Sequence, residues 1–170
     1  RFVLGPYDAA MAQLTGSREV LTETVDGDVI EDVTTPQLGM LVWKSGRTTE
    51  RTEGFIDGIQ MTTSVNYGAA GTRAIQEVVR VVPRPGAGNV EISMGGDSGS
   101  IWVDEESGKG GGLHFDGEVG NAPEHALAIE LQHVWLFYTS DAADTLPRVD
   151  RCLLSKRYIT NSQRTQPTRH

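Results

Sequence analysis

The sequence predicts an all-β fold. Short apolar or β-branched runs recur over the first 130 residues, and segments rich in glycine and proline separate them. Spacing of this kind is typical of antiparallel strands joined by turns in a barrel or a sandwich. A chain of 170 residues suits one domain with a sizeable core. We therefore expect one β-rich domain built from many short strands.

Seven segments carry the strand pattern. They are, in order, LGMLVWK (38–44), GFIDGIQMTTSV (54–65), AIQEVVRVV (74–82), NVEISM (89–94), SIWVDE (100–105), GLHF (112–115) and ALAIEL (126–131). The segment ESGKGGG (106–112) has the composition of a hairpin turn, because glycine adopts positive φ freely. It lacks the spacing of a phosphate-binding loop, which excludes that interpretation.

The C-terminal part departs from this pattern. The segment EHALAIELQHVWLF (124–137) has apolar spacing that suits either a helix or a strand that runs into one. From residue 137 the alternation is lost, and the string LFYTSDAADTLPRVD (136–150) resembles translated sequencing-adapter sequence. We expect residues 137–170 to be a disordered or artefactual tail.

Charge and composition exclude several functions. Lysine and arginine number 15 against 23 aspartates and glutamates, which gives a net charge of −8 without a basic stripe. Nucleic acid and anionic membranes are therefore poor partners. Cys152 is the only cysteine, so no intrachain disulfide can form, which favours a cytoplasmic, reducing compartment. The localisation stays open, because any targeting segment would lie upstream.

The segment MGGDSGSIWV (94–103) places Ser98 between glycines. A serine hydroxyl needs a base, a group that orients the base, and donors for the oxyanion that forms. Without a Cβ at Gly96, the backbone can turn so that the N–H groups of Gly96 and Ser98 converge on one point. We interpret Ser98 as a nucleophile and these two amides as its oxyanion hole.

Four segments together resemble the chymotrypsin-like (trypsin-fold) serine proteases. GGDSGS (95–100) is similar to their nucleophile motif, and KSGRTT (44–49) is similar to a signature of the bacterial branch near α-lytic protease and the streptogrisins. GLHFDGE (112–118) resembles the strand that lines the primary specificity pocket. PYDAAMAQL (6–14) resembles the aspartate segment, which makes Asp8 the candidate triad aspartate.

This resemblance implies a double β-barrel that lacks the N-terminal part of its first barrel. Residues 1–38 would be a remnant of the first barrel and residues 39–136 the complete second barrel, with a short C-terminal helix allowed. The family's catalytic histidine precedes its aspartate, whereas all four histidines here follow Ser98. We expect the histidine to lie upstream of this chain, in a segment required to complete the fold, and the chain as given to be inactive.

The resemblance also implies the residues that bind a protein or peptide substrate. They are Ile92, Ser93, His114, Phe115 and Gly117. Ile92 occupies the position where trypsin-like enzymes carry an aspartate, so a basic side chain is disfavoured there. His114 resembles the histidine with which glutamyl endopeptidases and picornavirus cysteine proteases contact a Glu or Gln side chain. The alternative is that His114 has only a structural role, satisfied by packing and one hydrogen bond.

Two further expectations concern buried charge and metals. The resemblance implies one of two partners for Asp97: a freed N-terminus, as in activated trypsin relatives, or an internal arginine, as in bacterial members. Arg73 and Arg80 are the candidate arginines, and Arg1 is not a residue typical of an activated N-terminus. His114, His125 and His133 have no histidine or cysteine partner at ligand spacing, so we expect no metal site and no cofactor.

The functional hypothesis is a serine endopeptidase. The alternative is a catalytically inactive, protease-like module that binds a peptide by strand addition. A β-rich structural protein with an accidental motif is the third possibility.

Overall fold

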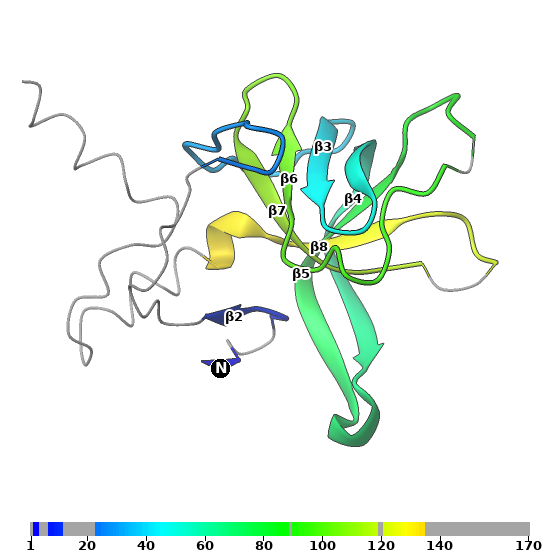
Figure 1. Ribbon diagram of the computed structural model, residues 1–170. Coiled ribbons are helices and arrows are strands. Elements are labelled where there is room, and N and C mark those ends of the chain that lie inside the picture. Colours follow the sequence, from blue (N-terminus) through cyan, green and yellow to red (C-terminus); the bar gives the residue numbers. More distant parts are fainter. Residues whose placement is uncertain (1, 4–6, 12–22, 89, 119–120, 135–170) are drawn as a thin grey trace, which may run out of the picture.

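The structure is a computed structural model that describes residues 2–3, 7–11, 23–88, 90–118 and 121–134. Six strands of this described part form a closed barrel in the order β3-β4-β5-β8-β7-β6, and β6 pairs back with β3 (Figure 1). All neighbouring pairs are antiparallel. The strands are β3 (Leu41–Gly46), β4 (Glu50–Asn66), β5 (Thr72–Pro83), β6 (Ile101–Asp104), β7 (Gly110–Gly117) and β8 (Ala126–Glu130). The prediction of an all-β barrel is confirmed.

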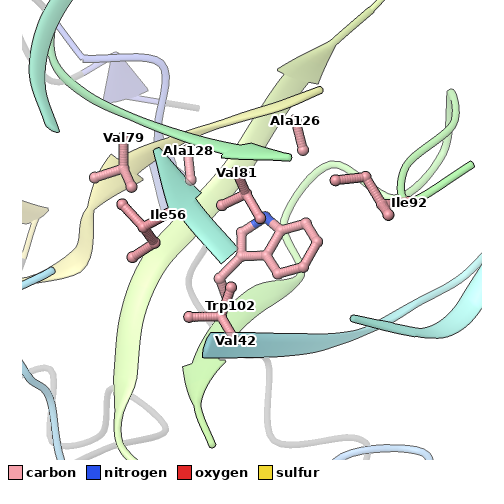
Figure 2. Close-up of a cluster of buried hydrophobic side chains, with 8 residues drawn as sticks. All are labelled: Val42, Ile56, Val79, Val81, Ile92, Trp102, Ala126 and Ala128. Atoms are coloured by element: carbon pink, nitrogen blue, oxygen red, sulfur yellow. The ribbon is translucent and has the colours of Figure 1, made fainter. Parts of the chain in front are cut away.

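The barrel closes over an apolar core (Figure 2). Trp102 of β6 is its largest fully buried side chain and lies against Val42, Val81 and Ile92 in the view of Figure 2. Side chains from β3, β4, β5, β6 and β8 meet there because alternate residues of each strand point inward. Truncating a buried tryptophan costs about 3–5 kcal/mol, so Trp102 is a main determinant of barrel stability.

The hairpin of β4 and β5 extends beyond the barrel (Figure 1). The two strands have 17 and 12 residues, and the 3₁₀ turn η1 (Gly68–Ala70) joins them. Their register shifts at three places, one of them between the pairs Met61–Val78 and Thr63–Ile75. Glu77 lies in that last interval with φ +54°, which is a bulge conformation.

The N-terminal part lies outside the barrel. β1 (Phe2–Val3) and β2 (Ala10–Met11) pair as a separate two-stranded sheet. Nearer the barrel, the Gly110 N–H donates to the Asp32 carbonyl and the Thr34 N–H donates to the Gly110 carbonyl, both at 2.9 Å. The chain therefore runs along the start of β7 before it enters β3.

One predicted strand is wrong. Residues 90–94 form no strand, because side chains rather than a neighbouring strand satisfy their backbone. Glu124 accepts hydrogen bonds from the N–H groups of Ile92 and Ser93, and Thr52 Oγ1 donates to the Ile92 carbonyl. The segment is thus a hydrogen-bonded loop that leads into the nucleophile sequence.

The ambiguous segment 124–137 is a strand that runs into a helical turn. β8 ends at Glu130, and residues 131–134 are helical. The predicted tail at 137–170 lies outside the described residues. No helix among the described residues is long and apolar enough to cross a membrane.

Candidate active site

The loop that carries Ser98 is fixed to strand β7. The Asp97 N–H donates to the Met94 carbonyl at 3.1 Å, which closes a tight turn. The Gly99 N–H donates to the His114 carbonyl at 2.8 Å, and the His114 N–H donates to the Ser100 carbonyl at 2.9 Å. These bonds hold the loop in one conformation over the end of the barrel.

Asp97 anchors the loop through a buried ion pair and several hydrogen bonds. Its Oδ2 lies 3.1 Å from Lys44 Nζ, and both side chains are fully buried. Thr49 Oγ1 donates to the same oxygen at 2.6 Å, and the Thr48 N–H donates to Oδ1 at 2.7 Å. The partner of Asp97 is therefore Lys44 and not an arginine. Of the two expected arginines, Arg80 pairs instead with Asp57.

Burial by itself would raise the pKa of Asp97. Hydrogen bonds from Thr49, Thr48, Met94 and Lys44 outweigh burial and hold that pKa well below its ordinary value. Burial lowers the pKa of Lys44, against the hydrogen bond and the charge of Asp97. Lys44 Nζ also lies 5.5 Å from the centre of the Trp102 ring, which offers a cation–π contact.

The KSGRTT turn between β3 and β4 packs directly against this loop. A Cβ at Gly46 would lie 2.5 Å from Asp97 Oδ1, and a Cβ at Gly96 would lie 2.5 Å from Thr48 Oγ1. Thr48 Oγ1 also donates to the Gly95 carbonyl at 3.0 Å. A Cβ at either position would meet a side-chain oxygen of the other segment, so glycine at both positions lets the KSGRTT turn pack against the Ser98 loop, which explains why the two motifs occur together.

The backbone amides of Gly96 and Ser98 lie on either side of Asp97. Gly96 has φ +108°, a conformation that favours glycine. Within the described part of the chain, neither the Gly96 N–H nor the Ser98 N–H donates a hydrogen bond. Because Asp97 between them is held rigidly, two unused donors flank one fixed residue.

Ser98 opens into a pocket whose walls come from its own loop and from β7. Its Oγ donates to the Phe115 carbonyl at 3.2 Å. The lining residues are Ser93, Met94, Gly95, Ser98, His114, Phe115, Asp116, Gly117 and Glu118. The pocket thus contains Ser98 and four of the five predicted substrate contacts.

The fifth predicted contact, Ile92, lies elsewhere. Its side chain is 1% exposed and packs in the hydrophobic core beside Trp102, and it is not among the lining residues. Burial in the core removes the apolar Ile92 side chain from water, whereas the adjacent Ser93 lines the pocket.

His114 is a buried, neutral imidazole at the pocket wall. Its side chain makes an edge-to-face contact with Trp102, and the residue is 3% exposed. Burial and the charge of Lys44 lower the pKa of His114 to about 4. The Leu127 backbone partly opposes this lowering of the pKa, and the Nδ1 atom is buried with no hydrogen-bond partner among the described residues.

Comparison with solved structures identifies the fold. A glutamic acid specific serine protease, described as using a histidine triad in substrate binding, matches with TM-score 0.54 and 22% identity over 74% of this chain and 62% of its own. The Nocardiopsis protease matches with TM-score 0.52 and 19% identity over 70% of this chain and 57% of its own. The chain has a chymotrypsin-like fold. No family model and no curated protein matches it.

The chain spans about three fifths of the length of these two proteases. The fold inferred from GGDSGS and KSGRTT is confirmed. At this level of identity the likeness concerns the fold.

Asp8 reaches the chymotrypsin-like barrel through the long hairpin. Tyr67, at the end of that hairpin, donates its hydroxyl to Asp8 Oδ2 at 2.7 Å. Burial, followed by Asp8 and then Asp116, raises the pKa of the Tyr67 phenol. Asp116 lines the pocket, so Tyr67 lies near both carboxylates. Among the described residues, no contact joins Asp8 directly to Ser98.

Sequence reasoning missed Lys44, Thr48 and Thr49 as supports of the nucleophile loop. All three belong to the KSGRTT segment that carried the resemblance. A lysine among short polar residues, close to a strand end, was the available signal. Nothing in the sequence alone indicated which buried acid, more than 45 residues away, would be its partner.

Proposed function

We propose that this chain is part of a serine endopeptidase in which Ser98 is the nucleophile. The observation that carries the proposal is the pair of unused amides at Gly96 and Ser98, fixed on either side of the anchored Asp97. Donors held in place before the reaction stabilise the oxyanion without reorganisation. The chymotrypsin-like fold supports the same conclusion.

The chemistry follows from these groups. Ser98 Oγ attacks the carbonyl carbon of the scissile peptide bond, and its proton passes to a histidine base that lies upstream of this chain. The Gly96 and Ser98 amides hold the oxyanion. The C–N bond then breaks, the amine leaves with the proton, and water hydrolyses the acyl-enzyme. Asp8 would orient the histidine. The Tyr67 hydroxyl, which donates to Asp8 Oδ2, would hold the Asp8 carboxylate in place.

The pocket favours a neutral or basic substrate side chain over a carboxylate. Asp116 and Glu118 line the pocket, and no lysine or arginine does so among the described residues. His114 is neutral at physiological pH because its pKa is about 4, so the pocket wall offers no positive charge to a carboxylate.

The direct test joins the chain to its upstream coding segment and follows hydrolysis of fluorescein-labelled casein. We expect activity that Ser98→Ala abolishes and Asp8→Asn lowers by about 10⁴, since loss of the orienting carboxylate leaves the wrong histidine tautomer. Ser64→Ala is the matched control, because this serine of β4 is exposed and lies outside the pocket.

The inactive, peptide-binding module is the rival. It predicts that the extended chain folds and binds a peptide without cleaving it. A folded extended protein that leaves casein intact, with Ser98 unreactive, would favour that module and overturn the enzyme.

A further inference from the structure

Outside the pocket, two carboxylates converge across neighbouring strands. The pair Val78–Ile129 fixes the register of β5 against β8, and the next residues outward are Glu77 and Glu130. Glu77 lies in a β-bulge with φ +54°, and a bulge changes the direction of the side chain that it carries. Like charges directly opposite each other destabilise a sheet, so this arrangement requires a compensating positive charge.

His133 completes the group. The helical turn 131–134 places it three residues after Glu130, and its Nδ1 lies 3.6 Å from Glu130 Oε2. One ligand atom from each of Glu77, Glu130 and His133 lies within 4.8 Å of the other two. Three atoms bound to one divalent ion at about 2.0–2.2 Å each would satisfy this spacing.

The imidazole is oriented and its inner nitrogen is unused. Tyr7 stacks on the His133 ring at an interplanar angle of 8°, with 6.2 Å between the ring centres. Nδ1 is buried and has no hydrogen-bond partner among the described residues. The Glu130 side chain is only 12% exposed. A fixed ring therefore turns an unsatisfied nitrogen toward a largely buried carboxylate.

The described chain supplies no permanent cation at this place. None of its lysines or arginines forms an ion pair with Glu77 or Glu130. The lysine and arginine pairs of the described residues involve other acids.

We propose that Glu77, Glu130 and His133 bind one divalent transition-metal ion, with Zn²⁺ as the best match. One imidazole and two carboxylates are ligands that suit Zn²⁺, whereas Ca²⁺ and Mg²⁺ prefer oxygen alone. Spacing of histidines and cysteines in the sequence predicted no site, because Glu77 lies more than 50 residues from the other two ligands. The site joins β5, β8 and the helical turn beneath Tyr7, independently of Ser98.

The test titrates ZnCl₂ into the chelator-stripped full chain at pH 7.5 by calorimetry. A Cys152→Ser background removes the thiol as a competing ligand. We expect one ion per chain, and Glu77→Gln, Glu130→Gln and His133→Asn each to weaken binding at least tenfold. His125→Asn, which replaces a partly exposed histidine outside the cluster, is the matched control and should bind as the parent does.

Folding is checked by circular dichroism, and Glu77→Gln keeps the proposal testable if either of the other two variants unfolds. CaCl₂ in place of ZnCl₂ should bind at least tenfold more weakly. Absence of Zn²⁺ binding at millimolar concentration, or unchanged one-to-one binding by the folded Glu77→Gln variant, would overturn the proposal. Weakening by His125→Asn equal to that by Glu77→Gln would also overturn it.

Discussion

Lys44 Nζ lies 3.1 Å from Asp97 Oδ2, with both side chains fully buried, and this ion pair ties strand β3 to the residue before Ser98. The Asp97 carboxylate also accepts hydrogen bonds from Thr48, Thr49 and Met94. The conformation of the nucleophile loop therefore depends on a charge that must stay paired.

Removal of one partner should be costly. Lys44→Met leaves the Asp97 charge buried without its counter-ion, so we expect the free energy of unfolding to fall by about 3–5 kcal/mol in urea titrations. Lys109→Met is the control, because Lys109 and Asp32 form a pair in which both side chains are more than 40% exposed. It should cost no more than about 1 kcal/mol. Equal losses for the two variants would contradict the anchoring role of Lys44.

A side chain at Gly96 should strain the loop. Gly96→Ala combines φ +108° with a Cβ placed 2.5 Å from Thr48 Oγ1. Gly108→Ala also has a positive φ, of +69°, but its Cβ would meet nothing within 4 Å. We expect Gly96→Ala to destabilise the chain by about 1–3 kcal/mol more than Gly108→Ala, measured as urea unfolding. No difference would show that the Thr48 side chain moves aside from the new Cβ at little cost.

The neutral state of His114 predicts a pH dependence of stability. A histidine ionises near 6.5 when unfolded and near 4 here, so the unfolded state binds the extra proton between these values. The contribution of the neutral His114 ring to the free energy of unfolding is complete above pH 6.5. It is lost as the pH falls toward 4, and the total loss is about 3 kcal/mol. Urea titrations at pH 7 and 4.5 should show this loss in the parent chain and a much smaller one in His114→Gln.

The matched control is His125→Asn. This histidine is partly exposed, with its Nδ1 at 3.0 Å from the Pro123 carbonyl, and its replacement should leave the loss of stability between pH 7 and 4.5 in place. If His114→Gln lost stability with falling pH as steeply as the parent, the imidazole would not be the titrating group.

The pocket charges predict a substrate preference for the active, extended protein. Peptides with Gln before the scissile bond should be cleaved about tenfold faster, as kcat/KM, than the same peptides with Glu, because Asp116 and Glu118 repel a carboxylate. Asp116→Asn should bring the ratio of kcat/KM for the Gln peptide to kcat/KM for the Glu peptide closer to one. Faster cleavage after Glu than after Gln would contradict the proposed repulsion of a substrate carboxylate by Asp116 and Glu118.

Much of the barrel was predictable because its strands alternate apolar and polar residues between glycine-rich turns. The segment 89–94 shows the limit of that pattern. Its alternation is strand-like, but Glu124 and Thr52 take its hydrogen bonds, and long-range side-chain contacts leave no local signal.

The site was predictable to the same extent. Ser98 and four pocket residues share a local motif or a strand, so their proximity follows from chain order. The Lys44–Asp97 pair, the inward turn of Ile92 and the approach of Glu77 to His133 depend on barrel closure, which brings distant segments together. Sequence spacing does not contain that information.

The nucleophilic character of Ser98 is tested most directly by fluorophosphonate labelling of the chain joined to its upstream segment, followed by peptide mapping by mass spectrometry. The account predicts one phosphonyl adduct on Ser98, abolished by Ser98→Ala and retained by Ser93→Ala. A folded extended protein that carries no adduct, or one labelled on Ser93 instead, would contradict it.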